Sequence, residues 1–426
     1  MQHSQQHGAV LLIVLLLVAV IAATALQVRR PQDQQRRMQA LQAAKQALLA
    51  NAQLKSFGNA ATDSAKPGNY FYLPCPANPP GQPTRLEGNQ QPVCGADGVN
   101  VIGHLPWRTL DMPSADQTGE CLWYIVSGYQ KNNPQALHNT DSYGLLQIID
   151  QNGQIIVGAT PETRPVALIV SPGPALRRQV RGQADLCGAP DVDQFLEGYQ
   201  GTTTAGAISQ WQTRPPSDQY NDLLVTISRD ELYQTSAFTE QQLQQDLTGL
   251  HQRLAECWVS YLQNFSRLPE PAGYSLTDPR KNNQYQEQSG FAGRLPYFYD
   301  SLVGLPGCRL DEQPRWKNLW KNWKDHFFYR ISQSVNFVGS QAVCVACLRL
   351  QSQPRLAVIA FAGEPLPALN QTRYLAPDTE TRSRVENYLE AWWPSTATGT
   401  EDLVISGLTN DQVICINPDW SLSACD

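Results

Sequence analysis

Cys344 and Cys347 form a CxxC motif, which is the strongest local candidate for chemistry in this 426-residue sequence. Such a pair can be a redox centre or can supply half of a zinc site. A zinc site needs a second pair of ligands nearby, and the histidines beyond residue 8 are scattered. They are His104, His138, His251 and His326. A redox centre needs a helix N-terminus, whereas 342–350 has the pattern of a strand or hairpin. We therefore expect a structural disulfide here, with no metal and no cofactor.

The number and spread of the cysteines indicate an oxidising compartment. The chain has ten of them, an even number, distributed over everything beyond residue 70. Cys75 and Cys94 flank a stretch rich in Pro, Gly and Asn, and we expect them to close one loop. Cys415 and Cys425 are expected to tie down the C-terminal tail. Connectivity cannot be read from spacing, and the alternative interpretation is a set of buried free thiols in a cytosolic protein.

The sequence contains no catalytic or nucleotide-binding signature. The GxSxG, HExxH, P-loop and dinucleotide-binding glycine patterns are all missing. Charged residues make up 16% of the chain and the net charge is −6, so there is no basic stripe for a nucleic acid. We therefore expect neither an enzyme nor a nucleic-acid-binding protein.

Two Asn-Asp pairs each precede an apolar run. Asn221-Asp222 leads into LLVTIS, and Asn410-Asp411 leads into QVICIN. Such a pair predicts a turn followed by a strand, because the side chain can hydrogen-bond its own backbone. The alternative interpretation is a carboxylate site.

The elements that position these residues begin with an apolar segment. Residues 9–26 are eighteen uncharged residues, which as a helix would span a bilayer core, and we expect a transmembrane helix over 9–30. An amphipathic helix and linker are expected over 31–66, where Met38, Leu41 and Leu48 recur at helical spacing. The arginines after residue 28 would keep the rest of the chain in the cytoplasm, but the cysteines and the size of the following part favour export.

The eight-residue polar leader ends in Gly8 and directly abuts this apolar run. A cleaved secretory signal or a plain signal anchor would also contain an apolar run. The combination with a following amphipathic helix, however, resembles the type IV prepilins. The resemblance implies that a prepilin peptidase cuts after Gly8 and that Ala9 becomes a methylated N-terminus. The leader departs from the usual pattern, since it carries His3 and His7 where prepilins carry Lys or Arg.

A second departure from the usual prepilin pattern is Ile13, where most pilins have glutamate. The large minor pseudopilin at the tip of type II secretion filaments also lacks that glutamate, and the start of the run resembles it. A subunit at the tip has no terminal amine ahead of it to pair, so a buried carboxylate would be costly. The resemblance further implies that Ile13, Leu16 and Val20 pack the helix into a filament.

The rest of the chain is internally similar in five blocks that keep one order. The blocks are GHLPW (103–107) with GRLPY (293–297), LWYIVS (122–127) with FFYRIS (327–332), VALIVSPGPAL (166–176) with LAVIAFAGEPL (356–366), FLE (195–197) with YLE (388–390), and the two Asn-Asp pairs. A helical pattern over 240–264 precedes the second copy, as 33–55 precedes the first. We therefore expect two copies of one fold, each with its own helix.

The predicted fold class is α+β. A long N-terminal transmembrane and amphipathic helix is followed by two tandem pilin-like units, each a helix packed on a small antiparallel sheet and held by disulfides. The expected divisions are a leader (1–8), the transmembrane helix (9–30), the amphipathic helix and linker (31–66), a first head (67–230), a helical linker (231–290) and a second head (291–426).

An aromatic stripe lies in an apparent insertion of the second copy. Trp316, Leu319, Trp320, Trp323 and Phe327 recur at threes and fours, with lysines between them. A membrane-surface helix is one interpretation. Packing against the second sheet is the interpretation we prefer, since such stripes usually face a core.

Together these patterns predict a minor pilin or pseudopilin-like component of a type IV pilus or type II secretion filament, at or near its tip. The expected partners are other pilins or pseudopilins, the prepilin peptidase and the inner membrane, with the C-terminal part periplasmic or extracellular. The alternative is an envelope-anchored adhesin or receptor that uses the N-terminal helix only as a tether. An exported enzyme is a third hypothesis, with no motif in its favour.

Overall fold

The structure is a computed structural model of the whole chain. It describes residues 32–53, 68–77, 88–116, 119–131, 137–181, 187, 191–234, 237–338, 341–373, 379–390, 392–394, 396–405 and 409–425.

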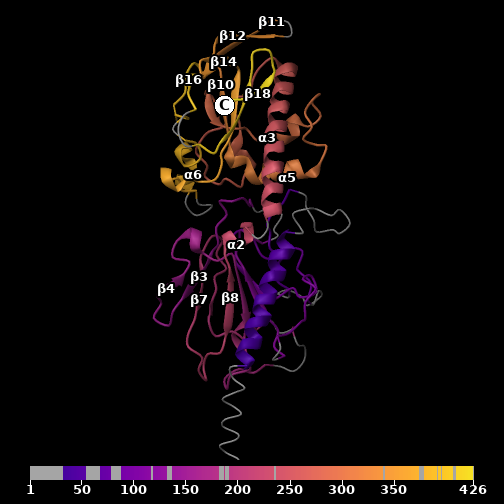
Figure 1. Cartoon of the computed structure of the whole chain (residues 1–426), viewed down its shortest axis with the longest axis vertical. Coiled ribbons are helices and arrows are strands. Elements are labelled where there is room, and N and C mark those ends of the chain that lie inside the picture. The colour runs from indigo at the N-terminus through magenta and orange to yellow at the C-terminus, as the bar shows by residue number, and fades with distance from the viewer. Residues whose placement is uncertain are drawn as a thin grey trace, which may run out of the picture.

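Two units are stacked along the long axis of the molecule (Figure 1). The first unit comprises residues 32–234, and its helix over 32–53 lies on a four-stranded antiparallel sheet of order β1-β2-β5-β8. Its strands are β1 (Val101–His104), β2 (Trp123–Val126), β5 (Ala167–Ser171) and β8 (Leu223–Ile227). The helix is amphipathic: Leu41, Ala44 and Leu48 are fully buried, while the residues between them are largely exposed.

The second unit comprises residues 237–425 and repeats this arrangement. Its helix α3 (Ala237–Phe265) packs on β17 of a five-stranded antiparallel sheet of order β18-β17-β15-β10-β9. The strands are β9 (Ala292–Arg294), β10 (Phe327–Ile331), β15 (Ala357–Phe361), β17 (Gln412–Ile416) and β18 (Leu422–Ala424).

Further strands form smaller sheets. The first unit adds β4-β3-β7-β6, with β3 (Leu146–Ile149), β4 (Ile155–Val157), β6 (Tyr199–Gln200) and β7 (Ser209–Gln212). The second adds β14-β13-β16, with β13 (Leu348–Leu350), β14 (Gln353–Arg355) and β16 (Asp402–Leu403). A separate hairpin joins β11 (Ser334–Val338) to β12 (Gln341–Ala346).

Short helices connect these strands. They are α2 (Arg229–Gln234), α4 (Tyr299–Leu302), α5 (Pro314–Trp323) and α6 (Thr379–Ser383). Single 3₁₀ turns lie at Pro161–Thr163, Val192–Gln194, Asn282–Tyr285, Lys324–His326, Pro367–Leu369 and Val385–Asn387.

The expected fold class is wrong in its architecture. We predicted one small antiparallel sheet per unit, whereas the described residues form five sheets, two of which are of mixed type. Strand β3 pairs with β7 in parallel, and β13 pairs with β16 in parallel. The physical reason is that all five residues of β5 and all five of β15 are buried, so each central strand is apolar on both faces. A helix covers one face, and the small mixed sheet covers the other.

The membrane-spanning part of that prediction is also corrected. Among the residues that the structure describes, no helix is both long enough and apolar enough to cross a bilayer. The expected transmembrane segment, 9–30, lies outside the described residues. We therefore do not retain the prediction that the chain is anchored in the inner membrane.

The two main sheets have the same register, residue for residue. In each, a tyrosine of the second strand faces a glycine of the first strand and an isoleucine of the third. The matched pairs are Gly103–Tyr124 with Gly293–Tyr329, Tyr124–Ile169 with Tyr329–Ile359, and Ile169–Val225 with Ile359–Ile414. Because a slip by one residue would turn every side chain to the other face, equal register shows that both copies bury equivalent positions.

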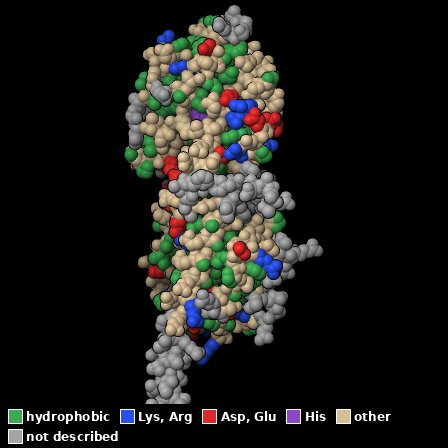
Figure 2. Space-filling model, turned by 45° about the vertical axis from the view of Figure 1, so that its right-hand side comes forward, with side chains coloured by type: hydrophobic (Ala, Val, Ile, Leu, Met, Phe, Trp, Pro, Cys, Tyr) green, Lys and Arg blue, Asp and Glu red, His purple; other side chains and the backbone are tan. Residues whose placement is uncertain are grey.

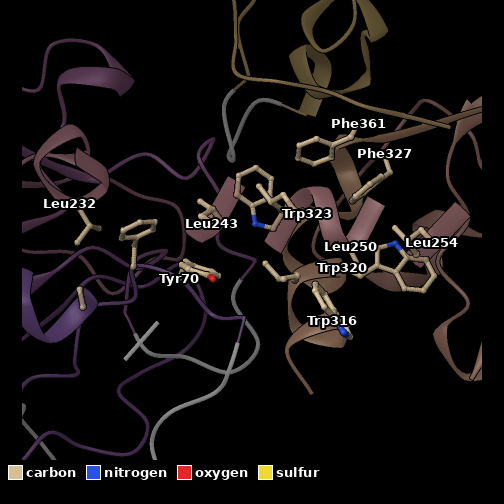
Figure 3. Close-up of a cluster of buried hydrophobic side chains, with 14 of the residues drawn as sticks. Tyr70, Leu232, Leu243, Leu250, Leu254, Trp316, Trp320, Trp323, Phe327 and Phe361 are labelled. Carbon is tan, nitrogen blue, oxygen red and sulfur yellow. The ribbon is translucent and has the colours of Figure 1, made fainter. Parts of the chain in front are cut away.

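One hydrophobic core runs through both units. It contains Leu41 and Tyr124 of the first unit together with Leu250 and Tyr329 of the second. Figure 3 shows the crossing, with Tyr70 and Leu232 on one side of Leu243 and the tryptophans of α5 on the other. The aromatic stripe is therefore core: its five residues are all buried. A shared core predicts that the units unfold together.

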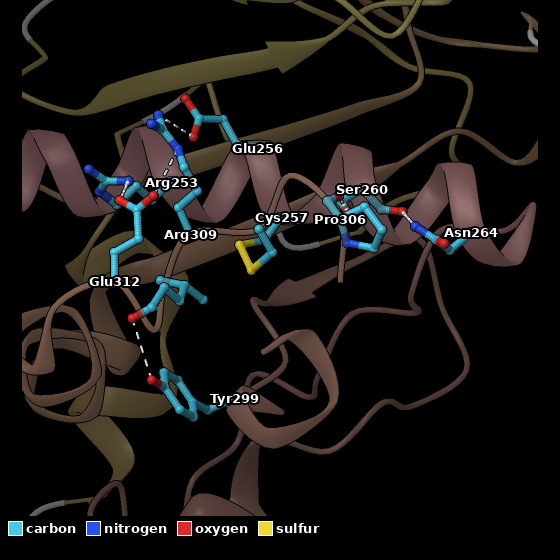
Figure 4. The surroundings of a disulfide bond; sticks show 11 residues. Arg253, Glu256, Cys257, Ser260, Asn264, Tyr299, Pro306, Arg309 and Glu312 are labelled. Carbon is cyan, nitrogen blue, oxygen red and sulfur yellow. Dashed lines mark hydrogen bonds and ion pairs between the residues drawn. A yellow bond between two sulfur atoms is a disulfide. The ribbon is translucent and has the colours of Figure 1, made fainter. Parts of the chain in front are cut away.

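Five disulfides hold the loops of the two units. They are Cys75–Cys94, Cys121–Cys187, Cys257–Cys308, Cys344–Cys347 and Cys415–Cys425. The first, fourth and fifth are the pairs named as candidates from the sequence. Cys257–Cys308 ties α3 to the loop before α5 and is flanked by two ion pairs, Arg253–Glu312 at 3.3 Å and Arg309–Glu256 at 3.4 Å (Figure 4).

Replacing Trp320 by Ala tests the shared core. Trp320 is fully buried and contacts the rings of Trp258 and Tyr297. We expect Trp320→Ala to lower the free energy of unfolding by about 3–5 kcal/mol, because transfer and cavity costs add. Calorimetry should still show one transition, moved to lower temperature. Val180→Ala, at a side chain that is 82% exposed, is the control. Two separate transitions in the parent protein would contradict a shared core.

Candidate functional site

A pair of carboxyl groups, one buried and one partly buried, lies at the end of the first sheet. Asp222, at the turn before β8, accepts hydrogen bonds from the backbone N–H groups of Glu197 (2.8 Å) and Gly198 (3.3 Å). The Glu197 side chain in turn accepts the backbone N–H of Asn221 at 3.1 Å. Asp222 is 4% exposed. The buried carboxyl group of Asp222 therefore lies beside the partly buried carboxyl group of Glu197, where water screens the charges only weakly.

The second unit contains the same pair in the same place. Asp411, before β17, accepts the backbone N–H of Gly363 at 3.1 Å and the indole N–H of Trp392 at 3.2 Å. Its neighbour Glu390 is buried and accepts the hydroxyl of Thr409 at 2.9 Å. Asp411 also lines a cavity of about 500 Å³ beside α3. The glutamate of the FLE block thus lies beside the first Asn-Asp pair, and the glutamate of the YLE block lies beside the second.

Each carboxyl pair is framed by one further repeated motif, Gln-x-Arg. In the first unit Gln179 accepts the backbone N–H of Leu176 at 2.9 Å, and in the second unit Gln371 accepts that of Leu366 at 2.8 Å. The arginines of the motif, Arg181 and Arg373, donate to the carbonyls of equivalent glycines at 2.6 and 2.7 Å. The same turn chemistry is therefore built twice.

The aspartate of each pair holds a proton near neutral pH. Burial, and the adjacent carboxylate of Glu197, raise the pKa of Asp222 to about 8. Burial, with the hydrogen bond and charge of Glu390, raises the pKa of Asp411 to about 8. Two carboxylates in contact cannot both ionise cheaply, so each pair shares one proton.

A second cluster of charges lies where the units meet. Asp141 of the first unit and Asp325 of the second flank the imidazole of His326, at 3.2 Å from Nε2 and 3.1 Å from Nδ1. The guanidinium of Arg382 contacts Asp325 and lies 3.8 Å from Asp141, and that of Arg373 also lies 3.8 Å from Asp141. All five side chains are fully buried or nearly so.

The charges of this cluster are mutually compensated. Burial alone would lower the pKa of His326, but Asp141 and Asp325 outweigh it, so the pKa lies above its ordinary value. Burial would raise the pKa of Asp325, and Arg382 with His326 holds it well below its usual range. The cluster is thus a network of ionised groups that ties the first unit to the second.

This cluster does not suit a metal ion. Asp141, Asp325 and His326 place their ligand atoms within 4.8 Å of one another. Both imidazole nitrogens, however, already face carboxylates, whereas a metal ligand must leave one nitrogen as a free acceptor. Two guanidinium groups also supply the positive charge that a cation would bring. The donor set therefore fits an ion-pair network.

The interface cluster is closed to solvent, whereas Glu197 and Asp411 of the carboxyl pairs are partly exposed. A general acid or base must come within hydrogen-bond reach of a substrate, and Asp141, Asp325 and His326 are each less than 1% exposed. What these groups can do is hold turns and units in place in a manner that depends on pH.

Comparison with known proteins adds no relative. No protein-family model, curated protein or solved structure matches this chain.

The site residues predicted from the N-terminal segment cannot be placed. Gly8 and Ala9, the expected processing position, and Ile13, Leu16 and Val20, the expected packing face, all lie outside the described residues. The six candidate cysteines, by contrast, lie in the two heads, far along the chain from that segment, where they form three disulfides.

Sequence reasoning missed the interface cluster. Asp141 and Arg382 stand in no motif, Arg373 belongs to the Gln-x-Arg repeat that sequence analysis did not identify, and His326 was noted only as one of four scattered histidines. The carboxyl pairs had a signal: Glu197 and Asp222 recur as Glu390 and Asp411 in the repeated blocks. We preferred to interpret the aspartates as turn residues, and they do precede strands, but they are also buried partners of a second carboxyl group.

The shared protons predict that stability falls as pH rises. A folded-state pKa of about 8 against an ordinary value of 3.8 means that each aspartate binds a proton more tightly when folded. Its contribution is therefore complete below about pH 4 and is lost by about pH 8. We expect Asp222→Asn and Asp411→Asn each to reduce the fall in unfolding free energy between pH 5 and 8, and the double variant to reduce it further.

Urea denaturation at several pH values measures this slope. Asp230→Asn removes one exposed carboxylate from α2 and serves as the matched control. Equal slopes for the parent and the double variant would show that no proton is shared.

Neutralising Arg382 tests the interface network. We expect Arg382→Met to cost about 3–5 kcal/mol in unfolding free energy, because it leaves buried carboxylates without their partner. Adding Asp325→Asn should recover part of the loss. Arg309→Met breaks a solvent-exposed ion pair and should cost under about 1 kcal/mol in the same urea titration. If Arg382→Met lowered the unfolding free energy no more than Arg309→Met does, the cluster would not be an interface network that stabilises the fold.

Proposed function

We propose that this chain is a structural subunit of the minor pilin or pseudopilin kind, acting at the tip of a type IV pilus or type II secretion filament. The proposal includes other pilins or pseudopilins and a prepilin peptidase as partners, and it assigns no enzymatic activity. The proposal is based on the sequence of the leader and the apolar run. Three features of the described residues support it.

The observation that carries the proposal is the helix over 32–53. One face packs on the first sheet through fully buried Leu41, Ala44 and Leu48. The opposite face is exposed and rich in glutamine, including Gln34, Gln35, Gln39, Gln42 and Gln46. Near its start, Gln34 to Gln42 line a shallow groove of about 570 Å³. A helix with one face buried and the other open suits lateral contact with the helices of neighbouring subunits.

The helix is also latched to its sheet by a buried arginine. Arg37 donates to the hydroxyl of Ser171 at 2.8 Å and to the carbonyl of Asn221 at 2.9 Å. Ser171 in turn donates to Asp116 at 2.7 Å. These bonds fix the helix to the head, which suits a subunit that is held in a filament by its helix.

Compartment and surface support the same class. Five disulfides and no free cysteine among the described residues favour an oxidising environment. In the view of Figure 2, acidic and basic side chains are intermingled and most of the surface is uncharged. Such a surface suits contacts with other protein subunits better than contacts with a polyanion.

Processing at Gly8 is the deciding experiment. The parent chain, coexpressed with a prepilin peptidase, should lose residues 1–8 and begin at Ala9, as read by mass spectrometry of the intact protein. Gly8→Leu should retain Met1, because the peptidase cuts after the glycine. Gln6→Ala, within the leader but away from the cut, should be processed like the parent. A parent that keeps Met1 would favour the alternative of an adhesin or receptor.

A further inference from the structure

Strands β8 and β17 occupy the same position in the two main sheets, but their outer edges differ. On the inner side, β8 pairs with β5 and β17 pairs with β15 in one register. On the outer side, β17 carries an additional antiparallel strand, β18, with Ile414 opposite Ala424 and Ile416 opposite Leu422. In the order of the first sheet β8 is the last strand.

The direction of the backbone groups identifies the free edge. In an antiparallel strand the N–H and C=O of one residue point to the same side, and neighbouring residues alternate. The carbonyl of Ile227 accepts the N–H of Val166 at 2.8 Å and thus points inward. Thr226 and Leu224 therefore direct their N–H and C=O groups outward.

In the second unit, the outward backbone groups of the equivalent strand, β17, are paired with a further strand. The equivalent of Leu224 is Val413, whose carbonyl accepts the N–H of Cys425 at 3.1 Å from the outer side. In the first unit, no backbone group of the described residues other than those of β5 and Val166 pairs with Leu223–Ile227. The outward groups of Leu224 and Thr226 are thus the counterparts of groups that are paired in the second unit.

We propose that the outer edge of β8 binds an extended segment of a partner protein, which adds to the first sheet as a fifth antiparallel strand. Edge strands recruit peptides in this way, with main-chain hydrogen bonds supplying affinity and alternate side chains supplying specificity. The inference goes beyond the proposed function, since it holds whether or not the chain enters a filament.

The equivalent strand defines the chemistry of the partner segment. β18 places Leu422, Ser423 and Ala424 opposite Ile416, Cys415 and Ile414. Leu422 packs against the core on the helix side of the sheet. The partner should therefore supply an apolar residue opposite Ile227, a polar one opposite Thr226 and a small one opposite Val225.

The chain's own β18 is not the occupant. It already pairs with β17, and the Cys415–Cys425 disulfide holds its end there. Since no other strand of the described residues pairs there, we assign the position to a separate polypeptide.

The experiment uses the full chain and a synthetic peptide of residues 418–425 carrying Cys425→Ser. Hydrogen exchange of individual amides is followed by NMR with and without saturating peptide. We expect the Leu224 and Thr226 amides to exchange quickly in the free chain and about tenfold more slowly with peptide, because an added strand bonds those groups. The amides of β17 are the internal control and should not change.

Two variants separate strand addition from other binding. Thr226→Pro removes an outward N–H and should weaken peptide binding at least about tenfold, while leaving the β5 ladder intact because its N–H does not bond β5. Thr226→Val keeps the N–H and should bind like the parent. Folding of both is checked by protection of the β5 amides.

Three results would overturn the proposal. They are Leu224 and Thr226 amides already protected in the free chain, no slowing of those amides by the peptide, and equal binding by Thr226→Pro and the parent. Should Thr226→Pro fail to fold, the exchange footprint of the parent decides alone.

Discussion

The constraint on which the structure depends is that each central strand, β5 and β15, is buried on both faces. A strand of this kind needs apolar cover above and below, so a helix alone cannot complete the unit. The helix side joins the two units in one core, and the small mixed sheets close the opposite side with cores of their own. The third layer, the shared core and the equal register of the two sheets all follow from that single requirement.

Hydrophobic spacing along the sequence predicted the two long helices. The helical spacing of Leu41 and Leu48 predicted a helix, and that of Leu250 and Leu254 predicted α3. The layers could not be predicted from local spacing, because the residues that pair β3 with β7 in parallel are 63 positions apart in the sequence. The runs ALIVS and AVIAF did carry a signal: continuous burial, where a strand with one solvated face would alternate.

The two charged sites differ in the same way. The glutamate and the aspartate of each carboxyl pair both lie in blocks that recur in the two copies. The repeat therefore predicts the pairs if these two blocks are considered together. The cluster around His326 joins residues from both units that share no spacing, and Asp141 has no counterpart in the second copy. Its members become neighbours only through the docking of one unit on the other, and burial then selects ionised partners over isolated charges.

That missing counterpart makes the two copies differ in what they present between equivalent positions. In both copies a serine after the second strand accepts a backbone N–H at the start of a strand of the small mixed sheet, from Leu145 to Ser127 at 3.0 Å and from Leu348 to Ser332 at 2.9 Å. Between these fixed points the first copy inserts the loop that presents Asp141, and the second inserts the hairpin β11–β12 with Val343 and Val345 exposed. At the position where the first copy presents a carboxylate to the buried cations of its neighbour, the second copy therefore presents an exposed apolar hairpin, so the contact that joins the two units is used in one direction only.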